Sequence, residues 1–156
     1  RAPFNPEFAL GSIDESGWSY IADHAESAGG TPAYLAQEKA AQLETIRQRR
    51  AQYTPLRPPI DPAGRVVIVV DDGLATGATM ISALHALRAK QPARLVCAVP
   101  VAPADTLEKI RPYADEVVCL STPAFFQAVG QFYADFPQVE DSEVIEILRE
   151  AARPRS

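Results

Sequence analysis

The chain has 156 residues, 47% of them apolar, which is enough for a hydrophobic core, and we expect residues 1–156 to form a single domain. It carries 20 acidic and 15 basic residues, and the basic residues are scattered apart from Arg47, Arg49 and Arg50, so we expect no nucleic-acid partner. No signal peptide is recognisable and no apolar run approaches the ~18 residues of a membrane span, so we expect a cytoplasmic protein without a membrane partner.

A β-hairpin and a long helix are predicted for the first part of the chain. Two β-prone runs, Glu7–Ile13 and Trp18–Ala22, flank a group of turn residues. Gly29-Gly30-Thr31-Pro32 then opens a helix from about Pro32 to Tyr53, with Thr31 as its N-cap. Glycines before a helix can also bind an anion, but the Thr-Pro start signal favours the plain helix cap.

After a proline-rich connector, strand and helix patterns alternate. Strands are predicted at Val66–Val70, Leu95–Val101 and Glu116–Leu120, and helices at about Gly77–Lys90, Ala104–Tyr113 and Ser142–Ala152. The first of these strands is an uninterrupted β-branched run, as expected of a parallel strand that is covered on both faces. The alternation predicts an α/β fold with a parallel sheet and right-handed crossovers.

The cysteines and histidines show no metal-ligand spacing. Cys97 and Cys119 each lie inside an apolar run, and we expect both to be core thiols. His24 and His85 have no recognisable partner in the sequence, so we expect both on the surface.

The stretch from Val66 to Met80 carries the chemistry. Its strand ends in two consecutive carboxylates, Asp71 and Asp72, and ligands of open parallel sheets bind beyond the carboxyl ends of the strands. Thr76–Thr79 forms the turn into the next helix, where free backbone N–H groups, the helix dipole and two hydroxyls favour an anion such as phosphate. Gly77 lets the backbone approach that anion closely because it has no Cβ.

This short segment therefore offers donors for a phosphate and, a few residues earlier, two acceptors for neighbouring hydroxyls. That polarity fits a phosphorylated ribose, either free or within a nucleotide. For the acidic pair by itself, an ordinary strand-end turn is an equally good interpretation, but the coincidence of strand, acids, glycine and both threonines favours a binding site. A Walker A loop needs a lysine in this turn and a dinucleotide fingerprint needs a third glycine, and the segment has neither.

The segment resembles the signature of the type I phosphoribosyltransferases, which bind 5-phosphoribosyl 1-diphosphate. Its Leu74-Ala75-Thr76-Gly77 core is similar to the adenine-type enzymes. Two further stretches resemble an uncharacterised bacterial branch of the family, along nearly the whole chain: Asn5-Pro6-Glu7-Phe8-Ala9-Leu10-Gly11 and Ala128-Val129-Gly130-Gln131-Phe132-Tyr133. The resemblance implies a Rossmann-like core with three layers, α/β/α, and places the hairpin and the long helix before the sugar-binding loop.

The resemblance also implies roles for the residues of the segment. Asp71 and Asp72 are expected to hold the ribose 2- and 3-hydroxyls. The 5-phosphate is expected on Ala75, Thr76, Gly77, Ala78 and Thr79. Mg²⁺ is the implied cofactor, bound to the diphosphate and ribose oxygens and reached by the two aspartates indirectly, through the ribose or water. The implied partners are small molecules: 5-phosphoribosyl 1-diphosphate or a nucleotide, and a nitrogenous base.

Two departures from the family pattern bear on substrate and activity. Hypoxanthine-type members carry an Asp three positions after the second acid, and Ala75 at that position argues against a 6-oxopurine substrate. The family also places a diphosphate-binding loop upstream of the region that matches residues 5–11, so we expect this loop to be missing from residues 1–156. Because the chain opens with Arg1 rather than Met, we expect a fragment or processed product that lacks the N-terminal part of the family.

An aromatic-rich segment, residues 125–136, has two interpretations. Family members stack an aromatic ring on the acceptor base near this position, which makes Phe126, Phe132 and Tyr133 candidates for base stacking. Clustered aromatic residues also commonly pack into a core, and that interpretation is the simpler one.

Two functions of different classes fit these patterns. The first is a Mg²⁺-dependent phosphoribosyltransferase of the nucleotide-salvage kind, in which a nitrogenous base attacks the ribose and diphosphate leaves, although no residue stands out as a general base. The second is a non-catalytic or regulatory module that binds the same ligands. A sheet without the first strands of the family exposes an apolar face or edge, so we expect a homodimer.

Overall fold

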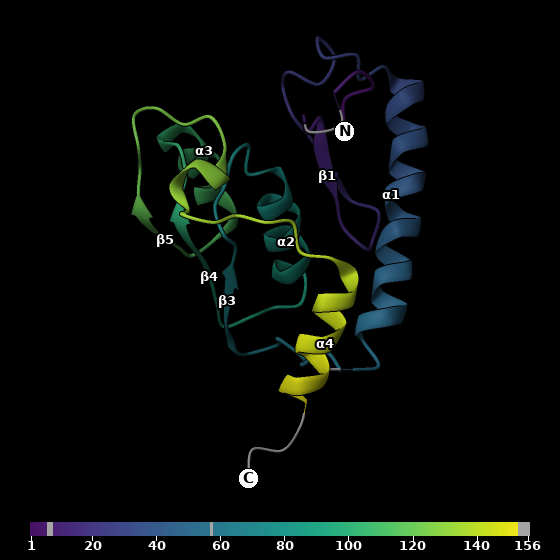
Figure 1. The fold of residues 1–156 in the computed structure, drawn as a ribbon, viewed down its shortest axis with the longest axis vertical. Coiled ribbons are helices and arrows are strands. Elements are labelled where there is room, and N and C mark those ends of the chain that lie inside the picture. Colours follow the sequence, from purple (N-terminus) through teal and green to yellow (C-terminus); the bar gives the residue numbers. More distant parts are fainter. Residues whose placement is uncertain (6–7, 57, 153–156) are drawn as a thin grey trace.

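The computed structural model describes residues 1–5, 8–56 and 58–152, and its elements follow the predicted order (Figure 1). Along the chain they are β1 (Gly11–Ile13), β2 (Ser19–Ile21), α1 (Pro32–Tyr53), β3 (Val66–Val70), α2 (Ala78–Arg88), β4 (Arg94–Val101), α3 (Ala104–Ile110), the 3₁₀ helix η1 (Arg111–Tyr113), β5 (Glu116–Ser121), the 3₁₀ helix η2 (Val129–Phe132) and α4 (Asp141–Ala151). The helix predicted over residues 104–113 changes to η1 around Pro112, whose nitrogen cannot donate an α-helical hydrogen bond.

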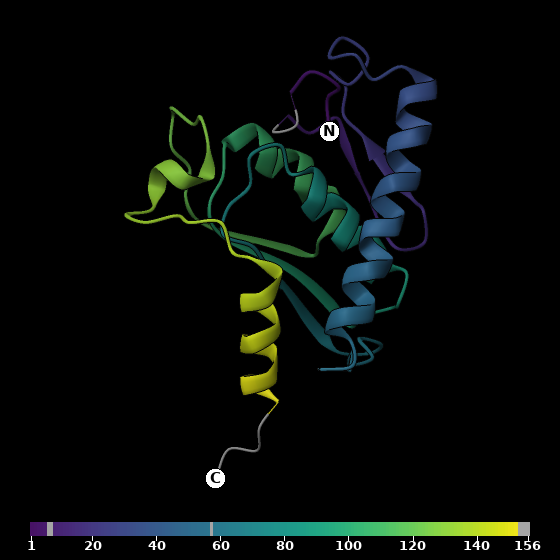
Figure 2. The ribbon, with the colours of Figure 1, turned by 45° about the vertical axis from the view of Figure 1, so that its right-hand side comes forward.

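The central sheet has three parallel strands in the order β3-β4-β5. Its register pairs Val69 with Cys97 and Val99 with Cys119, so these side chains share one face of the sheet. Helices α2 and α3 cover that face, whereas α4 runs along the other side (Figure 2). The predicted parallel α/β fold is confirmed.

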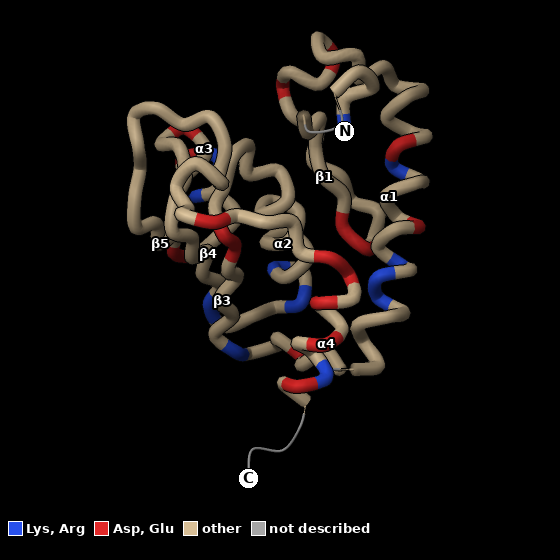
Figure 3. Tube along the Cα trace, viewed as in Figure 1, with Lys and Arg blue, Asp and Glu red and all other residues tan. Residues whose placement is uncertain are grey.

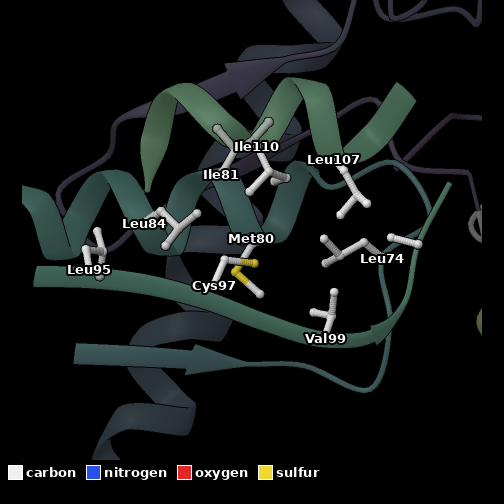
Figure 4. Close-up of a cluster of buried hydrophobic side chains, with 10 residues drawn as sticks. Leu74, Met80, Ile81, Leu84, Leu95, Cys97, Val99, Leu107 and Ile110 are labelled. Atoms are coloured by element: carbon white, nitrogen blue, oxygen red, sulfur yellow. The ribbon is translucent and has the colours of Figure 1, made fainter. Parts of the chain in front are cut away.

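The core lies between this sheet and the two covering helices. Leu95, Cys97 and Val99 of β4 pack against the apolar sides of α2 and α3 (Figure 4). Cys97 is fully buried, Cys119 lies at the margin of the cluster, and both are free thiols. The expected core position is confirmed for Cys97, whereas Cys119 is only partly buried at the edge of the core.

The opposite face of the sheet is open in the described part of the chain. Val66, Ile68 and Val70 alternate with the core-facing residues of β3 and are 63%, 59% and 72% exposed, and Leu120 of β5 is 82% exposed. The expectation that β3 is covered on both faces is therefore wrong for the residues described. The covering helices α2 and α3 both pack on one side, and α4 contacts α1 rather than shielding these side chains.

The hairpin and α1 form a second layer beside α2. β1 pairs with β2 in an antiparallel hairpin, as predicted, and Glu7 lies outside the described residues. Thr31 caps α1, because its Oγ1 accepts a hydrogen bond from the Tyr34 N–H at 3.3 Å, which supports the helix-cap interpretation of the Gly-Gly-Thr-Pro sequence. The Ser12 hydroxyl bonds to the Ala78 carbonyl and so ties the hairpin to the first turn of α2.

Both histidines are half-buried at the surface, and both side chains have partners that the sequence did not reveal. The His85 ring on α2 stacks on Trp18 of the hairpin with centroids 3.7 Å apart, and its Nδ1 lies 3.6 Å from the buried Asp14 carboxylate. His24 Nε2 lies 3.0 Å from the Ala9 carbonyl oxygen. Neither contact has a local signal, since each joins residues that are distant along the chain.

Lysine, arginine, aspartate and glutamate residues occur in many parts of the described chain. Figure 3 shows lysine and arginine in several separate places, interleaved with acidic residues, rather than gathered on one face. Within the described ranges, no helix combines the length and the apolar character that crossing a membrane requires.

Candidate functional site

Residues 71–77, which we term the β3–α2 loop, link the carboxyl end of β3 to α2 and are anchored to the core at their centre. Leu74 is 3% exposed, and its side chain lies among those of Val99 and Leu107 (Figure 4). Its N–H donates a hydrogen bond of 3.0 Å to the carbonyl oxygen of Val101 at the end of β4. The loop is therefore held across the carboxyl ends of two neighbouring strands, where ligands of parallel sheets bind.

Two glycines allow the close packing of this loop. A Cβ on Gly73 would lie 2.8 Å from Val129 and 2.9 Å from Val101. Gly77 has φ of 75°, in the left-handed region, and a Cβ there would lie 2.9 Å from Thr106 Cγ2. The sequence interpretation assigned Gly77 to close approach by a ligand, and the structure adds a second reason, which is close approach by α3.

The turn into α2 contains the residues that the sequence interpretation assigned to the phosphate. Helix α2 begins at Ala78, whose N–H donates a hydrogen bond of 3.4 Å to Thr76 Oγ1. Ala75 and Thr79 are exposed, and Thr76 is half-buried. Because the first N–H groups of a helix lack intrahelical partners, this turn offers N–H and hydroxyl donors at the positive end of the helix dipole.

The two aspartates lie at the other end of the same loop. Asp72 is exposed, whereas Asp71 is half-buried and accepts a hydrogen bond from the Asp72 N–H at 3.0 Å. Burial, assisted by the negative charge of Asp72, raises the pKa of Asp71 above its usual value, although that hydrogen bond acts in the opposite direction. The ionised Asp71 carboxylate therefore has too few hydrogen-bond donors to offset its burial, and hydroxyl donors or a cation on a ligand would stabilise it.

The aromatic segment, residues 125–136, reaches the same loop. The Tyr133 hydroxyl donates a hydrogen bond of 2.6 Å to the Asp72 carbonyl oxygen, and Val129 packs against Gly73. Phe126 and Phe132 contact each other with ring centroids 5.3 Å apart. Phe132 and Tyr133 are each 38% exposed, so they are surface residues beside the loop rather than members of the main core.

Thr106 is a site residue that the sequence interpretation missed. It is buried in α3, and its hydroxyl donates a hydrogen bond of 2.7 Å to the Ala75 carbonyl oxygen. The burial of Thr106 has one signal in the sequence, which is its position four residues before Ile110. This spacing places a polar residue on the buried side of a short helix. Nothing local indicates which carbonyl it binds.

The hydrogen-bonding groups of the loop, rather than concavity, identify the candidate site. A hollow of about 320 Å³ lies away from the loop, between the hairpin and α1, with an apolar lining that includes Leu10, Ile21 and Leu35. It contains none of the predicted site residues.

Among the described residues, no group of three or more His, Cys, Asp or Glu side chains is arranged to hold a metal ion. Asp71 and Asp72 form a pair, which fits Mg²⁺ only if a ligand supplies further oxygens.

Known proteins resemble this chain over nearly its full length. The phosphoribosyl transferase domain family matches residues 22–137, which include the β3–α2 loop and the aromatic segment. Proteins from two strains of Mycobacterium tuberculosis, which carry the provisional name phosphoribosyl transferase, are 42% identical over 154 residues. The alignment covers 97% of this chain but 34% of each relative, so the chain spans about a third of their length. The crystal structure of TT1426 from Thermus thermophilus is 44% identical, with a TM-score of 0.71, and the match covers 96% of this chain and 71% of that one.

Proposed function

Because the chain belongs to the phosphoribosyl transferase domain family, we propose that its β3–α2 loop binds 5-phosphoribosyl 1-diphosphate or a nucleotide, for transfer of the phosphoribosyl group to or from a nitrogenous base. One observation carries the proposal. The β3–α2 loop and the first residues of α2 combine two carboxylates, Asp71 and Asp72, with a turn of N–H and hydroxyl donors at Thr76–Thr79, and the fold holds both at the carboxyl end of β3.

In this proposal the two ends of the loop bind the two ends of the sugar phosphate. The 5-phosphate accepts hydrogen bonds from the first N–H groups of α2 and from the hydroxyls of Thr76 and Thr79. The ribose 2- and 3-hydroxyls donate to Asp71 and Asp72. Since the pKa of Asp71 is raised by burial, its charged form gains more from these donors than a fully solvated carboxylate would.

Mg²⁺ fits this pair of carboxylates. Such an ion is commonly bound through one or two protein carboxylates, with the remaining oxygens coming from phosphate groups and water. Asp71 and Asp72 would hold it, directly or through the ribose hydroxyls, and when bound it would neutralise charge on the departing diphosphate.

The chain contributes to the transfer mainly by positioning. A ring nitrogen of the base forms a bond to ribose C1, the bond from C1 to the diphosphate oxygen breaks, and the leaving group carries away the electron pair. The loop fixes the ribose, and the exposed rings of Phe132 and Tyr133, together with the half-buried ring of Phe126, offer stacking surfaces for the base beside it. No described side chain is assigned as a general base.

Diphosphate release tests the proposal. The purified chain is incubated with 5-phosphoribosyl 1-diphosphate, Mg²⁺ and a panel of bases, and we expect at least one base to cause release. Asp72→Asn and Thr76→Ala should each reduce that release and weaken binding of ribose 5-phosphate at unchanged thermal stability. Asp61→Asn, which alters an exposed aspartate in the proline-rich connector, is the matched control. Unchanged ligand affinity in both site variants would show that the site is elsewhere.

A non-catalytic ligand-binding module is the second candidate. It is favoured by the composition of the loop, whose acceptors and donors account for a ribose and one phosphate but leave the diphosphate without an assigned partner among the described residues. Calorimetry with ribose 5-phosphate, nucleoside monophosphates and 5-phosphoribosyl 1-diphosphate separates the two functions. Binding without diphosphate release indicates the module, and absence of binding contradicts both.

A further inference from the structure

Two hydroxyl groups from outside the β3–α2 loop each bind one of its carbonyl oxygens. The Thr106 hydroxyl of α3 donates to the Ala75 carbonyl, beside the phosphate-binding turn. The Tyr133 hydroxyl, which follows η2, donates to the Asp72 carbonyl, beside the carboxylates. Different elements of the fold therefore hold the two halves of the loop, the phosphate half around Ala75 and the ribose half around Asp72.

We propose that Thr106 and Tyr133 are positioning residues for the proposed sugar-phosphate site, with Thr106 orienting the phosphate half and Tyr133 the ribose half. The inference rests on the proposed function. It extends that function to two hydroxyl groups that bind the loop backbone, and the role of the Tyr133 hydroxyl is separate from the proposed stacking of the Tyr133 ring on the base.

The geometry of the peptide bond explains how Thr106 acts. In a planar trans peptide, the carbonyl of one residue and the N–H of the next point in opposite directions. Thr106 is buried, so its hydrogen bond directs the Ala75 carbonyl toward α3 and, by the geometry of the peptide, the Thr76 N–H away from α3. The Thr106 methyl group also lies against Gly77 and fixes the distance between α3 and the turn.

Tyr133 acts on the other half from a braced surface segment. The Gln131 side-chain oxygen accepts hydrogen bonds from the N–H groups of Gln127 and Ala128, at 2.8 and 3.2 Å. This bracing limits the conformational entropy that the Tyr133 hydroxyl loses when it binds the Asp72 carbonyl. The bond fixes the backbone from which the Asp72 carboxylate projects, and it joins the proposed base-stacking rings to the proposed ribose acceptors.

Calorimetry on variants that lack one hydroxyl tests the proposal, with ribose 5-phosphate and inorganic phosphate as probes. Thr106→Val should weaken binding of both probes by about three- to tenfold, the effect of one lost hydrogen bond, because both use the phosphate half. Tyr133→Phe should weaken ribose 5-phosphate binding by a similar factor and leave phosphate binding unchanged. Thr106→Ser keeps the hydroxyl and should bind both probes nearly as the unmodified chain does.

Matched controls remove a similar hydrogen bond at a distance from the loop. Tyr34→Phe deletes a tyrosine hydroxyl that donates to the Arg1 carbonyl, and Thr45→Val deletes a threonine hydroxyl that donates to the Ala41 carbonyl. Both should leave binding unchanged. If Thr106→Val does not fold, Thr106→Ala takes its place. Hydrogen exchange at the amides of residues 72–78 should be faster in Tyr133→Phe and Thr106→Val without ligand, and in neither control.

The outcomes separate this inference from the function on which it rests. If the unmodified chain binds ribose 5-phosphate and both site variants bind it equally well, the positioning roles are refuted while the site stands. Weaker binding without faster loop exchange also overturns positioning, as does equal weakening of both probes by Tyr133→Phe. If the unmodified chain binds no sugar phosphate, the proposed function is refuted, and the positioning roles that rest on it are refuted as well.

Discussion

Gly77→Ala tests whether the contact of α3 with the β3–α2 loop holds that loop in shape. Gly77 has φ of 75°, and an alanine in this left-handed conformation costs about 1–2 kcal/mol. The new Cβ would also lie 2.9 Å from Thr106 Cγ2 and 3.2 Å from Ile110 Cδ1. Overpacking of this kind costs about 1–3 kcal/mol. We therefore expect the free energy of unfolding to fall by about 2–5 kcal/mol.

Urea unfolding measures this loss, and Gly17→Ala is the control that isolates the packing contribution. Gly17 has φ of 87°, but a Cβ at this position would have no atom within 4 Å, so its substitution should cost only the backbone strain. Where Gly77→Ala remains folded, calorimetry should show ribose 5-phosphate affinity reduced at least about tenfold, because moving the turn by a fraction of an ångström misplaces the phosphate donors.

A double variant identifies the atom responsible. Thr106→Ser removes Cγ2 and keeps the hydroxyl, so in the Gly77→Ala background it should restore part of the lost stability, with a coupling of about 0.5–3 kcal/mol. The reasoning fails if Gly77→Ala costs no more than Gly17→Ala and binds ribose 5-phosphate as the unmodified chain does.

Three further predictions concern the site, the hairpin and the open sheet face. Asp71→Asn should raise the free energy of unfolding at pH 7 while weakening ribose 5-phosphate binding. Because burial raises the pKa of Asp71, this gain in unfolding free energy should shrink as the pH falls through the raised pKa. A gain that does not depend on pH would contradict the prediction. Asp14→Ala should lower the free energy of unfolding by about 1.5–3 kcal/mol at pH 7, since the carboxylate accepts hydrogen bonds from the N–H and hydroxyl of Ser16 and from the Trp18 N–H. Burial acts to raise the pKa of Asp14, but these hydrogen bonds and His85 lower the pKa overall. The loss of unfolding free energy, measured by urea unfolding, should therefore be complete at pH values above the usual aspartate pKa and should diminish as the pH falls through the lowered pKa. Finally, we expect the chain to sediment as a homodimer that buries the open sheet face. Ile68→Lys should give a monomer, whereas Ile60→Lys, at an exposed site in the connector, should have no effect. A stable monomer of the unmodified chain at micromolar concentration would refute this.

Local sequence signals were sufficient to predict the order of the elements and the position of the candidate loop. The predicted bounds of α1 and β3 agree with the structure, because a Thr-Pro cap and an uninterrupted β-branched run are local signals. The acidic pair and the Thr/Gly turn were placed at the end of β3 for the same reason, since strand, loop and helix start follow one another along the chain. Their assignment to ribose and phosphate stays a prediction.

The residues that support that loop, and the sheet face that is covered, depend on contacts between elements that are far apart along the chain. Thr106 reaches Ala75 across 31 residues, and Tyr133 reaches Asp72 across 61 residues. The same holds for the stacking of His85 on Trp18. A hydroxyl or a ring carries no local mark of its partner, because the partner depends on how separate elements approach each other in space. The β-branched run of β3 likewise indicates a preference for burial, but the packing of α2 and α3 on one side determined which of its side chains are buried.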